Sequence, residues 1–149
     1  MRLTEKTDED FLTIKAISDA SFSGGERPPE AALRYNFDNG EVFVRKFSRP
    51  VGSGGGRIVG FAIVTRASGG GAYLWSIATL STHREVGIAG ELIAEIIDHC
   101  EDTHEKDITL TVSVDNPAQK LYYDCGFRAV RVTQHFYGET SGLKMRRVL

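Results

Sequence analysis

Residues 87 to 101 carry the strongest periodic pattern in the chain, and they constrain its fold more than any other segment. Their apolar side chains recur every three or four positions and lie opposite acidic ones, which is typical of an amphipathic helix. The apolar stripe consists of Ile88, Ala89, Leu92, Ile93, Ile96, Ile97 and Cys100. Segments rich in β-branched and alternating residues flank the helix at 73–80 and 108–114. We therefore predict that this helix packs on a sheet.

The rest of the chain shows the same two patterns, in which apolar residues recur every three or four positions in helices and every second position in strands. Further helices are predicted at residues 10–22, from Pro28-Pro29 to the stop at 38–40, and from Asp115-Asn116-Pro117 to Gly126. Strands are predicted at 41–47, 58–65, 73–80, 108–114, 128–136 and 143–148. The glycine-rich segments 51–56 and 68–71 are predicted to be hairpin turns. Neither is followed by Lys-Ser/Thr and a helix, as a phosphate loop would be.

Length and charge exclude several classes of protein. The 149 residues predict one domain, 1–149, large enough for a core without disulfides or structural metal. Eighteen Lys and Arg against 20 Asp and Glu argue against a nucleic-acid partner, and no apolar run approaches the about 20 residues of a membrane span. Cys100 and Cys125 are isolated, which predicts reduced thiols and no metal site. With no apolar leader at the amino terminus, we expect a cytoplasmic protein.

The segment between the strand at 73–80 and the long helix carries a candidate anion site. It places Arg84 and the small residues Gly87 and Ala89 where backbone amides open a helix. Such amides and the helix dipole attract anions, and small residues let a phosphate approach the main chain. An Arg-x-x-Gly-x-Gly/Ala pattern arises by chance in roughly one chain of this size in seven. A second motif is needed to interpret it.

That second motif is Leu121-Tyr122 followed by Gly126-Phe127. With both motifs in this order, the sequence resembles the GNAT superfamily of acyl-CoA-dependent N-acetyltransferases. Residues 84–89 are similar to that family's pyrophosphate loop, and residues 121–127 to its Leu-Tyr-x-x-x-Gly-Phe signature. The resemblance implies an α/β (α+β mixed) fold with a central, mixed but mostly antiparallel twisted sheet of about seven strands and four helices. The implied order is strand, two helices, three strands, helix, strand, helix and two strands.

The resemblance also implies acetyl-CoA as the cofactor. Its pantetheine arm would bond to a strand where the fourth and fifth strands splay apart, and its pyrophosphate would rest on the amides after Arg84. The residues so implied are Ile77, Ala78, Thr79, Arg84, Glu85, Val86, Gly87, Ile88, Ala89, Gly90, Asp115, Asn116 and Ala118. In the family an Asn contacts the pantetheine arm. Asn116 matches it in residue type and Asp115 matches it in spacing, so either residue is a candidate for this contact.

For the reaction, the resemblance implies direct attack of a primary amine on the thioester. Tyr122 holds the family's acid position, and a phenol beside the sulfur can donate a proton to the leaving thiolate. Phe22 and Tyr137 are candidates for the acceptor pocket. Relatives carry a basic Glu at positions where this chain has Tyr73 and Leu110 or Thr111, so no base is assigned.

Three functions remain open from the sequence. The leading one is acetylation of a primary amine by direct attack on acetyl-CoA, and the second is acetylation of peptide or protein amino termini. The third is a non-catalytic acyl-CoA-binding module, which the missing Glu favours. The partners expected are therefore a small amine or a peptide acceptor, and the resemblance also allows a homodimer.

Overall fold

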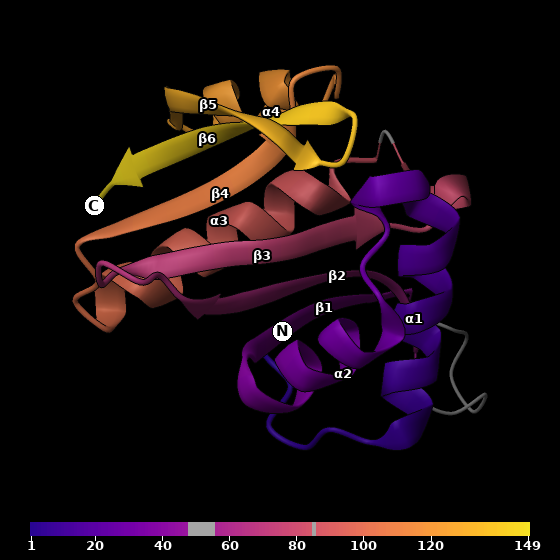
Figure 1. Cartoon of the computed structure of the whole chain (residues 1–149). Coiled ribbons are helices and arrows are strands. Elements are labelled where there is room, and N and C mark those ends of the chain that lie inside the picture. Colours follow the sequence, from indigo (N-terminus) through magenta and orange to yellow (C-terminus); the bar gives the residue numbers. More distant parts are fainter. Residues whose placement is uncertain (48–55, 85) are drawn as a thin grey trace.

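The computed structural model describes residues 1–47, 56–84 and 86–149, and it builds them around one six-stranded sheet of order β1-β2-β3-β4-β6-β5 (Figure 1). The helices are α1 (Asp8–Ser21), α2 (Glu30–Asn39), α3 (Ile88–Asp102) and α4 (Gln119–Asp124), with 3₁₀ turns at Gly24–Glu26 and Ser81–His83. The strands are β1 (Glu41–Phe47), β2 (Arg57–Arg66), β3 (Ala72–Thr79), β4 (Asp107–Ser113), β5 (Arg128–Tyr137) and β6 (Thr140–Val148). All neighbouring strands are antiparallel except β3 and β4.

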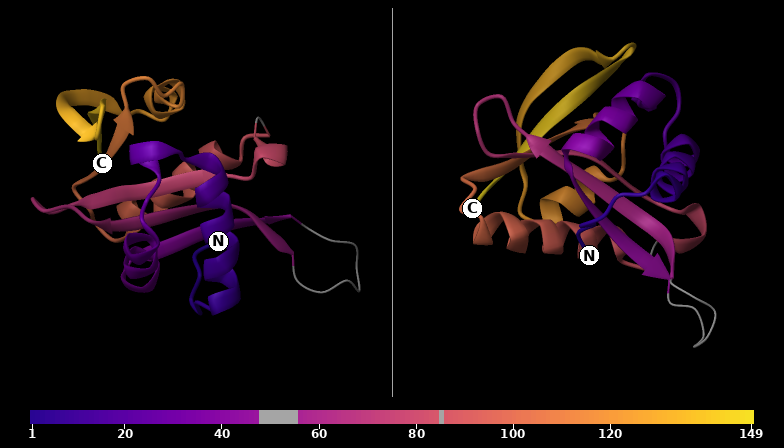
Figure 2. Two further views of the ribbon diagram at one scale, coloured as in Figure 1. Left: turned by 45° about the vertical axis from the view of Figure 1, so that its right-hand side comes forward. Right: turned by 90° about the horizontal axis from the view of Figure 1, so that it is seen from below.

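Helices cover both sides of this sheet. Figure 2 shows α3 on one side and α1 with α2 on the other. The stripe of α3 packs against the sheet through Leu92, Ile93 and Ile96, each no more than 1% exposed. On the opposite side, Ile14 of α1 and Phe37 of α2 are fully buried. The predicted placement of the long helix on a sheet is confirmed.

The predicted seven strands are one too many for the described residues. Before α1 the chain makes only an isolated bridge between Arg2 and Phe43, supported by a hydrogen bond from the Leu3 amide to the Val42 carbonyl. Thr7 already caps α1 by accepting a hydrogen bond from the Asp10 amide. The segment ahead of α1 is therefore too short for a ladder, and the order of elements starts with a helix.

Strand β1 departs from the expected alternation of apolar and polar residues. Val42, Phe43 and Val44 are all buried, because Phe43 joins the core under α3 while its two neighbours join the core under α1 and α2. The turn predicted at 68–71 is present, with the Ala67 amide bonded to the Gly71 carbonyl. The turn predicted at 51–56 lies outside the described residues except for Gly56.

The parallel seam between β3 and β4 is paired at one end only. Ala72–Leu74 pairs with Ile108–Leu110, and no pairing continues beyond Leu74. On its other edge β3 contains a bulge, because Ser76 pairs with Ile63 and Leu74 pairs with Val64, leaving Trp75 as an extra residue. A bulge increases the local twist, and so favours divergence of the two strands. The seam opens toward the carboxyl ends of β3 and β4.

Among the described residues, no helix combines the length and the apolar character that a bilayer span requires.

Candidate active site

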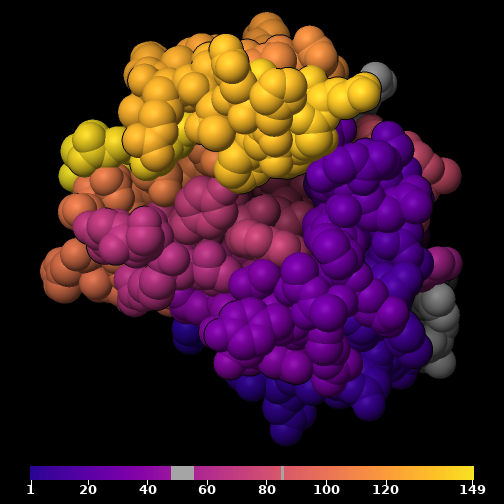
Figure 3. Space-filling view, viewed as in Figure 1, coloured from indigo at the N-terminus to yellow at the C-terminus, as the bar shows by residue number. Residues whose placement is uncertain are grey.

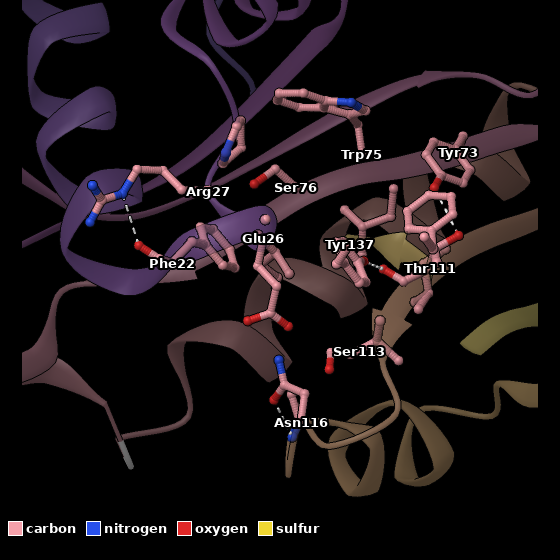
Figure 4. A pocket seen from close by; sticks show the side chains of 18 of the residues that line it. Phe22, Glu26, Arg27, Tyr73, Trp75, Ser76, Thr111, Ser113, Asn116 and Tyr137 are labelled. Atoms are coloured by element: carbon pink, nitrogen blue, oxygen red, sulfur yellow. Dashed lines mark hydrogen bonds between the residues drawn. The ribbon is translucent and has the colours of Figure 1, made fainter. Parts of the chain in front are cut away.

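A cavity of about 310 Å³ lies at the open end of the β3–β4 seam, and we call it the seam pocket. Figure 3 shows the hollow between the early helices and the carboxyl-terminal strands. Its floor comes from β3 and β4, and its walls come from α4, the α1–α2 connection and the β5–β6 hairpin (Figure 4). The residues that contribute polar side chains are Glu26, Arg27, Tyr73, Ser76, Thr111, Ser113, Asn116, Tyr122 and Tyr137.

The α1–α2 connection and the β5–β6 hairpin touch over the seam pocket. A Cβ atom on Gly25 would collide with the backbone carbonyl of Tyr137, so only glycine permits this approach. The hydroxyl of Tyr137 donates to the Thr111 carbonyl at 3.0 Å, which ties the hairpin to β4. The hydroxyl of Tyr73 donates to Oγ1 of the same threonine at 3.0 Å. Three elements that are distant in sequence thereby enclose one space.

Tyr122 lies on α4 and lines the seam pocket while being only 7% exposed. Its ring packs edge-on against Phe127 with the ring centroids 6.1 Å apart. The amide of Phe127 donates to the Tyr122 carbonyl at 3.0 Å, so the helix and its exit hold the phenol in place. Burial raises the pKa of Tyr122 to about 12. The phenol is therefore protonated at neutral pH and acts as a donor.

The amino terminus of α3 presents free backbone amides. Helix geometry leaves the first amides, those of Ile88, Ala89 and Gly90, without partners inside the helix. Gly87 precedes them with φ of +82° in the left-handed region, and no atom lies within 4 Å of a Cβ built there. The guanidinium of Arg84 donates to the Thr79 carbonyl at 3.3 Å and to Ser21 Oγ at 3.2 Å. The arrangement can bind a phosphate group with backbone amides.

The open edge of β3 offers unpaired backbone groups to the same region. The amide of Leu80 bonds to the Val59 carbonyl of β2, and antiparallel partners alternate. Ala78 therefore faces β2, whereas the amide and carbonyl of Ile77 and the amide of Thr79 turn toward the divergence from β4 without a strand partner; the Thr79 carbonyl accepts from Arg84. An extended ligand could bond there as an added strand would.

Comparisons with known proteins match this arrangement. The family model described as the acetyltransferase (GNAT) family matches residues 11–127. The chain is an acetyltransferase of the GNAT family. In the NatC complex bound to Gag peptide and CoA, one chain is 23% identical, with a TM-score of 0.79 and coverage of 100% of this chain and 98% of that one.

Two other solved structures share the GNAT fold with this chain. The ribosomal-protein-S18-alanine N-acetyltransferase from Escherichia coli is 18% identical, with a TM-score of 0.78 and coverage of 99% and 94%. Nourseothricin acetyltransferase is 19% identical, with a TM-score of 0.63, and the match covers 74% of this chain and 65% of that one. No curated protein matched the sequence.

The sequence-predicted residues of this GNAT acetyltransferase fall into two neighbouring groups. Phe22, Ile77, Asn116, Ala118, Tyr122 and Tyr137 all line the seam pocket. Arg84, Val86, Gly87, Ile88, Ala89 and Gly90 lie together at the start of α3, while Glu85 is outside the described residues. A Cβ on Gly90 would lie 3.8 Å from Leu121, the residue before Tyr122, so the two groups adjoin.

Three predicted cofactor residues belong to neither group. Ala78 and Thr79 lie in β3 and are each 8% exposed, and Asp115 is exposed. Of the two alternatives after β4, Asn116 is the one on the pocket wall. Its side-chain oxygen accepts a hydrogen bond from the Ala118 amide at 2.9 Å, which leaves its NH₂ group free to donate.

Sequence reasoning missed Glu26, the only carboxylate that lines the seam pocket within the described part of the chain. Figure 4 shows its side chain extending from the α1–α2 connection toward Asn116. The signal available was its place directly after Gly24-Gly25, in the loop between the first two helices. The carboxylate of Glu41 bonds to Arg2 and His99 and does not line this pocket.

Proposed function

We propose that this protein transfers the acetyl group of acetyl-CoA to a primary amine, and that its preferred acceptor is the α-amine of a peptide or protein. The observation that carries the proposal is the seam pocket, which brings a protonated phenol, Tyr122, and a carboxylate, Glu26, to one space beside an unpaired strand edge. These are the two kinds of proton-transferring group that aminolysis of a thioester needs.

The described residues fit acetyl-CoA at two places. The free amides after Gly87 would bind its pyrophosphate, and the open backbone groups of Ile77 and the amide of Thr79 would bond to its pantetheine arm. The cofactor supplies an acetyl group activated as a thioester. The amide of Ile77 faces the divergence and would polarise the acetyl carbonyl.

Tyr122 would stabilise the leaving sulfur. A thiol has a pKa near 8.5 and burial raises that of this phenol to about 12, so full proton transfer to a thiolate is uphill. We therefore assign the phenol a hydrogen bond to the developing negative charge, rather than complete protonation. Such a charge-assisted bond is roughly twice as strong as a neutral one.

Glu26 would accept the proton of the attacking amine. Burial raises the pKa values of both Tyr122 and Tyr137, so neither phenol is a base at neutral pH. A carboxylate is a weak base, and it works best on an amine that loses its proton readily. At pH about 7.5, about a third of α-amines are neutral, compared with about one in a thousand lysine side chains. This difference favours an α-amine acceptor.

The solved relatives support the same acceptor class. The NatC complex is bound to a peptide and the Escherichia coli enzyme is named for a ribosomal-protein alanine, and both match over nearly their whole chains. Nourseothricin acetyltransferase matches over a smaller share of each chain.

Thiol release from acetyl-CoA tests the proposal. We expect turnover with a peptide that has a free α-amine, and little with the same peptide blocked at its terminus and carrying one lysine. Small polyamines test the other acceptor class. Preferred turnover of the polyamines would overturn the peptide assignment, and acetyl-CoA binding without turnover on any amine would overturn the reaction itself.

The carboxylate is tested by Glu26→Gln, with Glu30→Gln as a matched control. Glu30 begins α2, is exposed and does not line the seam pocket. We expect kcat to fall about a hundredfold in Glu26→Gln and to stay near wild type in the control. The rate of Glu26→Gln should keep rising with pH through the ionisation of the α-amine, because solvent must then remove the proton. Equal rates in the two variants would remove Glu26 from the mechanism.

A further inference from the structure

The sheet face beside the seam pocket is basic where α1 and α2 leave it uncovered. In β6, Leu143 and Met145 are buried in the core under α3. Because side chains alternate along a strand, Lys144 and Arg146 project from the opposite face. Figure 2 shows that α1 and α2 lie over the β1–β3 side of the sheet and leave β5 and β6 free.

Strand β5 adds to this charge. Arg131 pairs with Lys144 and Arg128 pairs with Arg146, which places all four cations on the same face. We call Arg128, Arg131, Lys144 and Arg146 the basic platform. Asp107 pairs with Arg146 at 2.6 Å. Among the described residues, Arg131 and Lys144 make no ion pair, and Arg128 donates only to backbone carbonyls.

The basic platform adjoins the seam pocket. Thr111 of β4 lines the pocket, receives the hydroxyl of Tyr73, and is the cross-strand partner of Lys144. Arg131 lies on β5, opposite Lys144 of β6. In Figure 3 the surface of the carboxyl-terminal strands borders the hollow. A molecule with one end in the pocket could therefore continue onto the platform.

The charge is local to this part of the chain. Residues 128–149 contain five Lys and Arg and a single acidic residue, Glu139, although the whole protein has a net charge of −2. A cluster in which three of the four cations have no acidic partner among the described residues favours an anionic ligand. We propose that the basic platform binds acidic side chains of the acceptor, a few residues after its α-amine. This inference rests on the proposed function and specifies its substrate class.

The spacing sets where the acidic residues should lie. Neighbouring strands are about 4.8 Å apart, so Lys144 and Arg131 lie about one and two strand spacings from Thr111. An extended peptide advances about 3.3 Å per residue. With the amine inside the pocket, acidic side chains from about the third to the sixth residue would reach the platform.

The experiment compares three peptides that share their first two residues and differ at positions three to six, which are acidic, neutral or basic. We expect kcat/KM for the acidic peptide to exceed that for the neutral one about tenfold, through KM rather than kcat. The preference should shrink when the salt concentration is raised, because exposed charges are screened. Equal kcat/KM for the three peptides would overturn the proposal.

Variants locate the effect. In the double variant Arg131→Glu, Lys144→Glu we expect the preference to reverse toward the basic peptide. Lys144→Gln should lower the acidic preference about threefold, and Arg2→Gln, a matched control on the β1 side, should not. If the double variant fails to fold, Lys144→Gln and the salt dependence of wild type still show whether the basic platform causes the acidic preference. An unaltered acidic preference in Lys144→Gln would overturn the proposal.

Two further outcomes separate this inference from its alternatives. If wild type turns over none of the peptides, the proposed function fails, and equilibrium binding of the acidic and neutral peptides then tests the platform alone. If a short RNA oligonucleotide competes with the acidic peptide more strongly than an acidic peptide lacking a free amine does, the platform is a nucleic-acid site and the inference is overturned.

Discussion

The two ends of the β3–β4 seam are built from the same two strands but serve different purposes. At the closed end, Ala72–Leu74 pairs with Ile108–Leu110, and Ile108 is 1% exposed. At the open end the strands share no pairing, and the seam pocket occupies the gap. Buried backbone groups must find partners, so an unpaired edge beside a cavity is a place for a ligand. The fold forms its site by giving up sheet pairing locally.

The largest effect is expected from substitutions at the closed end of the seam, where they should change stability but not activity. Ile108→Ala should lower the free energy of unfolding by about 3 kcal/mol, because it leaves a cavity in the core under α3. Ile108→Val should cost about 1 kcal/mol. Urea unfolding measures both. The kcat of the folded fraction should be unchanged, and a specific loss of kcat in Ile108→Val would show that the two ends are not separable.

The second test is at the open end. Tyr122→Phe should lower kcat about a hundredfold, which corresponds to about 2.7 kcal/mol in transition-state free energy. Its free energy of unfolding should change by less than about 1 kcal/mol, since the ring still packs against Phe127. Thiol release measures kcat, and urea unfolding measures the free energy of unfolding. Full activity in this variant would refute the role assigned to the phenol.

Substitutions at two glycines separate an effect on acetyl-CoA binding from general destabilisation. Gly87 at the start of α3 and Gly70 in the β2–β3 turn both have φ above +80°. Alanine at either position should cost about 1–2 kcal/mol of stability through backbone strain. Only Gly87→Ala should also raise the KM for acetyl-CoA, by about tenfold, because it crowds the amides that would bind pyrophosphate. A similar rise in Gly70→Ala would assign the KM effect to general destabilisation.

The smallest expected effect is the pH dependence of stability. Burial raises the pKa of Tyr122 from 10.0 to about 12, so the folded state holds this proton more tightly than the unfolded chain does. The stabilisation is complete below pH about 10 and is lost as the pH rises through about 12. Between pH about 9 and 11, the unfolding free energy of wild type should fall about 1 kcal/mol more than that of Tyr122→Phe. Parallel pH profiles would show that the phenol is well solvated.

The spacing of apolar residues predicted the helices and strands because it reports which of their faces are buried. The stripe of α3 and the alternation of β4 gave their elements within about two residues of the observed bounds. The strand predicted at 41–47 matches β1, but the expected alternation of burial is absent, since both of its faces are covered and Val42, Phe43 and Val44 are all buried.

The candidate site was predictable only where residue type and spacing have a direct physical cause. Gly87 has a φ of +82°, which favours glycine, whereas Tyr122 was predicted through the resemblance of residues 121–127 to the family signature. The bulge at Trp75 comes from one extra residue, which no pattern within β3 reveals. Glu26 reaches the seam pocket through the packing of a short loop against Tyr137, a contact between segments more than a hundred residues apart.

The contact between Gly25 and Tyr137 has a consequence for how such an enzyme diversifies. The outer boundary of the seam pocket comes from a loop and a hairpin tip that contribute nothing to the pairing of β3 with β4. Insertions or exchanges in these two short stretches can reshape the entrance while the scaffold keeps its folding energy. Selection for new acceptors, in nature or from combinatorial libraries, can therefore proceed there without a penalty elsewhere.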